Sequence, residues 1–131
     1  MPDPPGGADG RPTEGREVSG SAQAYAALLD QPVQIVTAAA GGERAGCLVG
    51  FAGQCSLRPV RFAVWLSRAN RTWRVADRAD HLGVRLLDPE RLDLARLFGG
   101  ETDKFARTPW RSGPGGAPVL EGAAAWCVGA V

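Results

Sequence analysis

Residues 44–72, RAGCLVGFAGQCSLRPVRFAVWLSRANRT, contain two strand-like runs separated by a polar segment. The first run, residues 46–51, is rich in residues that favour strands, and the second, residues 60–66, places apolar residues at alternate positions. Residues 53–58 are too polar and too rich in glycine for a buried strand, and Pro59 lacks the amide donor that a central strand needs. The sequence therefore predicts that the chain bends at 53–58, and we expect the function to be located at this turn.

A group of hydroxyl, amide and guanidinium side chains follows the second run, where a helix capped by Asn70 is expected to begin. This composition predicts an anion site. Arg71, in the first helical turn, is the better phosphate ligand, whereas Arg74 and Arg78 on the same helix face are interpreted as solvated arginines. The residues of the predicted site are Ser67, Arg68, Asn70, Arg71 and Thr72.

The N-terminal part of the chain divides into a tail and the start of a domain. Residues 1–21 are rich in proline and glycine and are expected to be a disordered tail, followed by one domain over residues 22–131. After Ser21, the spacing of Tyr25, Leu28 and Leu29 predicts a helix of about two turns that Pro32 ends. Residues 33–39 then read as a strand that turns at 40–43 and returns antiparallel through 44–51.

Further elements follow the expected helix at Asn70. Residues 81–87 are predicted to be a strand, and Pro89 is predicted to open a helix that runs to Phe98 and ends at two glycines. Residues 101–118 read as one long loop carrying Lys104, Phe105 and Trp110, and such loops are often functional. Residues 119–120 and 123–131 are expected to be a final pair of strands.

Composition excludes several classes of function. The net charge of +1 gives no long-range field for nucleic acid or an anionic membrane, and no apolar run approaches the ~20 residues of a membrane helix. Three cysteines without CxxC spacing predict reduced thiols in a cytoplasmic protein and no metal site. The single histidine, His81, has no clear nucleophile beside it and is interpreted as a residue at a strand end.

Four short motifs together carry a resemblance to a known family. Residues 25–131 resemble the flavin reductase-like, FMN-binding split-barrel family, whose members show a strand ending in G-F, a Q-C-S turn, S-x-x-N-x-T after the next strand, and K-F-x-x-x-x-W before G-x-P-x-L-x-G. Here these motifs are Gly50 and Phe51; Gln54, Cys55 and Ser56; Ser67, Asn70 and Thr72; and Lys104, Phe105 and Trp110.

The resemblance implies a mainly β fold with short helices, an antiparallel Greek-key split β-barrel, in a homodimer that binds flavin at its cleft. Backbone groups at Val49, Gly50, Phe51 and Ala52 and the segment Gln54, Cys55 and Ser56 would contact the flavin ring. Ser67, Asn70, Arg71 and Thr72 would hold the phosphate of FMN, or of FAD in its place. Lys104 and Phe105 would close over the site, and Lys104 or Arg58 would stabilise reduced flavin.

Two features depart from the family pattern. Cys47, Leu48, Val49 and Gly50 stand where many members have T-x-S-S, and the C-terminal return strand with its G-D-H motif is missing after Val131. The barrel is therefore expected to be incomplete, with an open edge at residues 123–131.

The function implied by the resemblance is that of an oxidoreductase with no catalytic side-chain acid or base. It would transfer hydride from NAD(P)H to flavin and supply reduced flavin to a monooxygenase partner. The first alternative is a non-catalytic flavin-binding or dimerisation module. The second is a cofactor-free structural protein, in which residues 50–56 are only a tight turn.

Overall fold

The computed structural model describes residues 21–29, 32–100, 103–122 and 125–131, and it divides the chain into two compact units, residues 1–30 and 31–131. In the first unit the predicted helix is confirmed as α1 (Ala22–Leu28), whose N-cap hydroxyl, Ser21 Oγ, accepts a hydrogen bond from the Ala24 amide at 3.1 Å. The tail expected at residues 1–21 lies almost wholly outside the described residues. Helix α1 falls in the unit 1–30, so the domain boundary at residue 22 stays a prediction.

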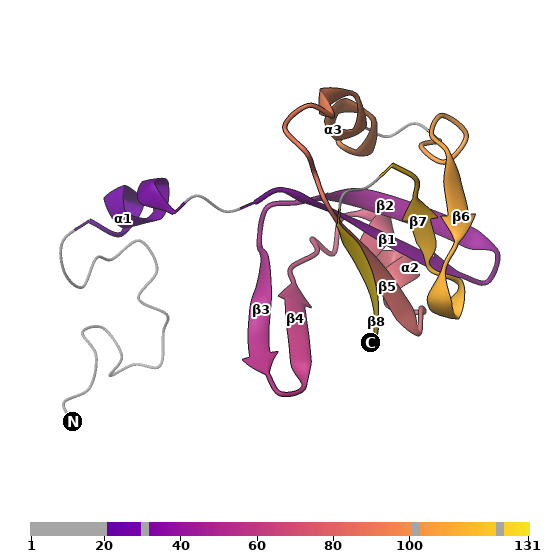
Figure 1. The fold of residues 1–131 in the computed structure, drawn as a ribbon, viewed down its shortest axis with the longest axis horizontal. Coiled ribbons are helices and arrows are strands. Elements are labelled where there is room, and N and C mark those ends of the chain that lie inside the picture. Colours follow the sequence, from indigo (N-terminus) through magenta and orange to yellow (C-terminus); the bar gives the residue numbers. More distant parts are fainter. Residues whose placement is uncertain (1–20, 30–31, 101–102, 123–124) are drawn as a thin grey trace. The chain divides into compact units, whose positions relative to one another are not determined.

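The second unit is built on a four-stranded antiparallel sheet in the order β2–β1–β5–β8 (Figure 1). The strands are β1 (Gln34–Ala40), β2 (Glu43–Val49), β5 (His81–Leu86) and β8 (Trp126–Ala130). The predicted hairpin of β1 and β2 is confirmed, with Ala40 opposite Glu43. Gly41 and Gly42 connect them at φ 57° and 81°, the left-handed conformations that a two-residue hairpin turn requires.

Strand β1 is buried on both faces, which makes it the centre of the core. On one face Ile35 packs with Leu94, Phe98, Phe105 and Leu120. On the other face, residues of β1 and β2 pack with helix α2 and with the base of the β3–β4 hairpin; they are Val36, Ala38, Ala45, Cys47 and Val49. The alternation along β1 therefore places two separate layers of side chains around one strand.

Two helices described in this unit contact β2, and each packs in a different one of the two core layers. Helix α2 (Arg71–Ala76) begins at Asn70, as predicted, and Asn70 Oδ1 accepts a hydrogen bond from the Thr72 amide at 2.9 Å. Helix α3 (Leu92–Phe98) begins three residues after Pro89, so the predicted start was wrong. Asp88, Pro89 and Glu90 instead form a bend in which the Arg91 amide donates to the Asp88 carbonyl.

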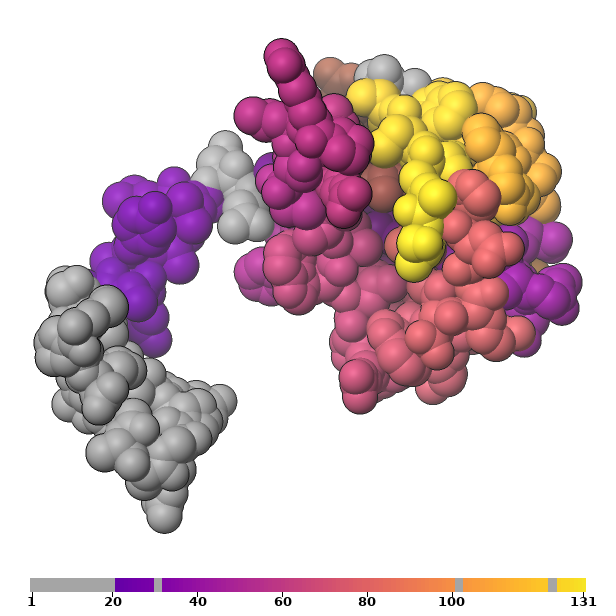
Figure 2. Space-filling view, turned by 90° about the horizontal axis from the view of Figure 1, so that it is seen from below, coloured from indigo at the N-terminus to yellow at the C-terminus, as the bar shows by residue number. Residues whose placement is uncertain are grey.

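The bend predicted at residues 53–58 is confined to Arg58 at its end, because residues 53–57 belong to a strand. Strand β3 (Ala52–Leu57) pairs with β4 (Val60–Val64), and the turn between them falls at Arg58 and Pro59. The hairpin projects from the sheet, and most of its side chains are exposed (Figures 1 and 2). Polar residues and glycine are tolerated there because β3 has a single partner strand and no buried face. The pairing register shifts between Gln54 and Ser56, which makes Cys55 a β-bulge.

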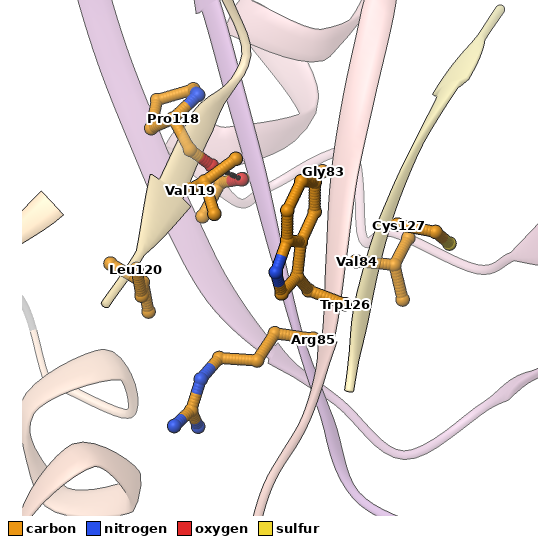
Figure 3. Close-up of a pocket in the computed structure, with 9 residues that line it drawn as sticks. Gly83, Val84, Arg85, Pro118, Val119, Leu120, Trp126 and Cys127 are labelled. Atoms are coloured by element: carbon orange, nitrogen blue, oxygen red, sulfur yellow. Dashed lines mark hydrogen bonds between the residues drawn. The ribbon is translucent and has the colours of Figure 1, made fainter. Parts of the chain in front are cut away.

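Residues 101–118 are not one long loop. Among the residues described there, β6 (Trp110–Ser112) pairs with β7 (Pro118–Leu120), and a short 3₁₀ turn, η2 (Pro114–Gly116), joins them. The expected pairing of the last two strands was also wrong, because β8 pairs with β5. Strand β7 instead lies against the sheet, where the Thr37 hydroxyl donates to the Pro118 carbonyl at 2.6 Å, and Arg85 and Trp126 face it across a narrow gap (Figure 3).

The fold is mainly β with short helices, as predicted. The described strands form an open sheet with β2 and β8 at its edges and two hairpins, so closure into a barrel stays a prediction. In the described parts of the chain, no helix is long and apolar enough to cross a membrane.

Candidate functional site

A groove of about 770 Å³ opens where β2, the start of α2 and the segment after α3 meet. This volume lies within the range of sites for cofactors, roughly 300–1,000 Å³. The groove is lined by residues 44–48 on β2, residues 67–74 except Arg68 and Trp73, and Phe98 with residues 99–105 as far as they are described.

The groove is basic. Arg44, Arg71, Arg74 and Lys104 line it, and Asp103 is the acidic side chain among the described lining residues. Because the whole chain carries a net charge of only +1, this local excess is a property of the groove and not of the surface in general. The groove therefore favours a ligand with negative charge.

Short polar groups line the groove at the connection between β4 and α2. The Asn70 amide donates to the Ser67 carbonyl at 3.0 Å, and Ser67 Oγ accepts from the Ala69 amide at 3.3 Å. Asn70 Oδ1 is used in capping α2, so the amide nitrogen Nδ2 is the end of this side chain that can donate to a ligand. Thr72 is only 1% exposed, and its side chain contributes to the floor of the groove.

The buried thiol of Cys47 lies in the same floor. Burial raises its pKa, while the hydrogen bond with the Thr72 side chain and the charge of Lys104 act in the opposite direction. Burial therefore favours the neutral form of the Cys47 thiol.

Lys104 and Phe105 lie at the groove in a different manner from that expected. Lys104 Nζ donates to the carbonyls of Gly46 at 2.5 Å and Phe98 at 3.0 Å, so it joins the loop to β2 and to the end of α3. Phe105 is 7% exposed and packs edge-on against Phe98 and Trp110. In this structure Phe105 is part of the core beneath the groove and not a lid over it.

A second cavity of about 470 Å³ lies on the β3–β4 hairpin. It is open and mainly apolar, and Phe51 and Trp65, which are 70% and 64% exposed, stand at its sides. The hairpin base holds these two together, because the Trp65 amide donates to the Phe51 carbonyl at 3.0 Å. The remaining lining residues are Ala52, Gly53, Gln54 and Cys55.

The structure divides the predicted site residues between these two cavities. Ser67, Asn70, Arg71, Thr72, Lys104 and Phe105 line the groove. Phe51, Ala52, Gln54 and Cys55 line the hairpin cavity. Val49 is 3% exposed in the core, Gly50 and Ser56 are in neither lining, and Arg58 is exposed at the hairpin turn.

Sequence reasoning missed part of the groove. Arg44, the second residue of β2, was not singled out as a site residue. Its guanidinium lies over the Trp110 ring at 4.5 Å, and the sequence does not show that these two distant residues are in contact. Arg74 was interpreted as solvated, and it is exposed but lines the groove. Gly46 permits the close approach of Phe98, since an added Cβ would lie 2.7 Å from that ring. A glycine inside a predicted strand was the available signal for this close approach.

Comparison with known proteins agrees with this architecture. A family model described as "Flavin reductase like domain" matches residues 26–131. A flavin reductase of Pseudomonas putida is 30% identical over 86 residues, which are 65% of this chain and 51% of that protein. The reductase subunit HsaB of a Mycobacterium tuberculosis flavin-dependent monooxygenase is 32% identical over 83 residues, 60% of this chain and 44% of that protein.

Solved structures share the fold. The NADH:FAD oxidoreductase SgcE6 of Streptomyces globisporus, in complex with NAD and FAD fragments, superposes with a TM-score of 0.71 at 23% identity, covering 77% of this chain and 62% of that chain. This chain spans about half the length of the two curated relatives above. Because the family model covers residues 26–131, most of the described structure, the chain belongs to the flavin reductase-like domain family.

Proposed function

We propose that this chain is a flavin reductase-like oxidoreductase of the cytoplasm that binds FMN, or FAD in its place, and brings it together with NAD(P)H. The observation that carries the proposal is the basic groove of about 770 Å³ in a chain of nearly neutral net charge. A flavin supplies the chemistry when bound, since it accepts hydride from a nicotinamide. The protein then needs to bind the flavin and the nicotinamide, to orient them and to exclude water. No side-chain acid or base is required.

The groove fits the phosphate end of a flavin nucleotide. Ser67 and Asn70 offer short neutral donors beside the guanidinium of Arg71, and Arg44 and Arg74 add positive charge along the same groove. A phosphate is bound best by several charge-assisted hydrogen bonds from such groups. The residues proposed to hold the phosphate are Ser67, Asn70, Arg71 and Thr72.

The hairpin cavity fits the planar ring of a flavin. Phe51 and Trp65 supply apolar, aromatic surface, and the backbone of β3 offers hydrogen-bonding groups beside Gly53, where an added Cβ would meet nothing within 4 Å. Open space beside a bare backbone is what a stacked ring needs. We therefore propose Phe51, Ala52, Gln54 and Cys55, which line this cavity, as ring contacts. Val49, Gly50 and Ser56 line neither cavity and keep this proposed role from the family resemblance alone, as do Lys104 and Phe105 at the groove.

Two partners are proposed for this chain, a monooxygenase and a second copy of itself. The relative HsaB is the reductase subunit of a flavin-dependent monooxygenase, which supports a monooxygenase as the consumer of reduced flavin here. Exposed apolar side chains on the β3–β4 hairpin, among them Leu57, Val60 and Phe62, support the association of two copies. A non-catalytic flavin-binding module is the second candidate, because the basic groove and the apolar hairpin cavity account for binding and do not by themselves require hydride transfer.

Asn70→Ala should weaken the binding of FMN about 10- to 150-fold and leave riboflavin binding unchanged. The lost hydrogen bond to a charged acceptor is worth about 1.5–3 kcal/mol, and riboflavin lacks the phosphate. Thr72→Ala should act in the same direction but also lower stability, because Thr72 is buried. Fluorescence titration with both flavins measures the effect.

Asn70→Asp is the matched control for the cap. It keeps the oxygen that accepts from the Thr72 amide but removes the Nδ2 donor and adds a negative charge, so it should preserve the melting temperature and still weaken FMN binding. Equal losses for FMN and riboflavin in these variants would reject the assignment of Asn70 to the phosphate.

Gly53→Ala should weaken both FMN and riboflavin about 5- to 150-fold, because its methyl group would project into the space assigned to the ring at a cost of about 1–3 kcal/mol. The free protein should tolerate the change, since the new Cβ contacts nothing within 4 Å and Gly53 does not have positive φ. Gly129→Ala on β8 is the control, with equally open space away from the hairpin. Undiminished flavin binding by Gly53→Ala would contradict the assignment of the flavin ring to this cavity.

A further inference from the structure

Glu43, at the first position of β2, holds two arginines of the α2 region at once. Its Oε2 lies 3.4 Å from Arg71 Nη2, and its Oε1 lies 3.0 Å from Arg78 Nη2. Glu43 is not among the residues that line the groove, whereas Arg71 is. The carboxylate therefore acts on the groove through the arginine that it holds.

Both terminal nitrogens of Arg71 are occupied in this arrangement. Nη2 contacts Glu43, and Nη1 donates to the Arg44 carbonyl at 3.0 Å. An arginine binds phosphate best with two parallel N–H donors. These two contacts fix the orientation of the guanidinium, and the Glu43 carboxylate neutralises its charge, so a phosphate in the groove competes with Glu43 for Arg71.

Breaking the ion pair between Arg71 and Glu43 costs little free energy in this structure. The Arg71 and Glu43 side chains are 57% and 50% exposed, and ion pairs in such positions contribute little to stability. Glu43 also keeps a partner when Arg71 leaves, because Arg78 stays on its other oxygen. The exchange thus leaves no carboxylate without a cation.

We propose that Glu43 is an internal competitor for the phosphate of the ligand, a latch that holds Arg71 at the β1–β2 turn until a phosphate in the groove displaces it. This inference rests on the proposed function, since it deepens the assignment of Arg71 to the phosphate. Glu43 is a positioning residue that tunes affinity for phosphorylated flavin over riboflavin.

The test is a titration of FMN and of riboflavin into Glu43→Gln, in three backgrounds. In the otherwise wild-type chain, Glu43→Gln should bind FMN about two- to fivefold more tightly, the range that a surface ion pair allows, and riboflavin with unchanged affinity. In the Arg71→Gln background the gain should disappear. In the Arg74→Gln background it should persist, because no ion pair or side-chain hydrogen bond joins Arg74 to Glu43 among the described residues.

Each outcome bears on the latch. Equal FMN affinity for the wild type and Glu43→Gln overturns it, as does weaker binding by the variant, which would mean that Glu43 orients Arg71 toward the ligand. A gain in FMN affinity that persists in the Arg71→Gln background also overturns it, because the effect would then come from the loss of a negative charge near the groove and not from Arg71. A wild-type chain that binds no FMN overturns the proposed function itself, and this result is distinct from binding that Glu43 does not influence.

Discussion

Phe98→Ala should lower the free energy of unfolding by about 3–5 kcal/mol, the range for truncating a fully buried phenylalanine. Phe98 is 1% exposed and packs edge-on against Phe105, with ring centroids 5.8 Å apart. Its ring also occupies the space above Gly46, which has no side chain to fill the cavity that the substitution would leave. Because Phe98 lines the groove as well, the variant should lose flavin binding along with stability.

Phe51→Ala is the matched control for this prediction. It removes the same side chain from a position that is 70% exposed, so its effect on the free energy of unfolding should stay within about 0.5 kcal/mol. Urea denaturation of the two variants measures the difference. A loss below about 1 kcal/mol for Phe98→Ala would mean that α3 does not form part of the core as described.

Gly83→Ala should lower the free energy of unfolding by about 2–4 kcal/mol, because overpacking and a broken buried hydrogen bond add. The new Cβ would lie 2.4 Å from Thr37 Oγ1 and 3.0 Å from the Pro118 carbonyl oxygen, the two atoms whose hydrogen bond joins β7 to the sheet. Neither atom can move freely, since one is backbone and the other belongs to a buried, β-branched side chain. The strand β7 would therefore have to shift away (Figure 3).

Gly129→Ala again supplies the comparison. Gly129 lies on β8, which pairs directly with β5, but an added Cβ there meets nothing within 4 Å. Its melting temperature should match that of the wild type or rise slightly. Wild-type stability in Gly83→Ala would show that β7 does not pack on β5 at this point.

Local signals were sufficient for the elements that the sequence predicted well. The hairpin of β1 and β2 has strand-forming residues on both sides of two glycines, and the start of α2 has Asn70 in front of a helical run. Each of these features depends on neighbours a few residues apart. The local sequence therefore indicated these elements without knowledge of the tertiary packing.

The errors arose where tertiary context decided the structure. Residues 53–58 were judged against the requirements of a buried strand, but β3 is an exposed member of a two-stranded hairpin and has no such requirements. Strands β6 and β7 have three residues each, too few to show alternation, and β7 is held by the bond from Thr37.

The candidate site shows the same limit. Ser67 and Asn70, the proposed phosphate donors, could be singled out because one short motif contains them, and both line the groove. Lys104 was singled out, but its ammonium group is held by the carbonyl of Gly46, a partner 58 residues away. Glu43 and the Arg44 carbonyl contact Arg71 only because the start of β2 lies beside α2, an arrangement that no local pattern encodes.

The central claim, that this chain binds a flavin and exposes it to reduced nicotinamide, is tested most directly by the absorbance spectrum of the purified protein with added FMN, followed by NADH or NADPH without oxygen. We predict that the protein perturbs the FMN band and that the reduced nicotinamide bleaches it faster than in free FMN. A perturbed band that does not bleach faster would favour the non-catalytic module. An FMN spectrum unchanged by the protein would contradict the account.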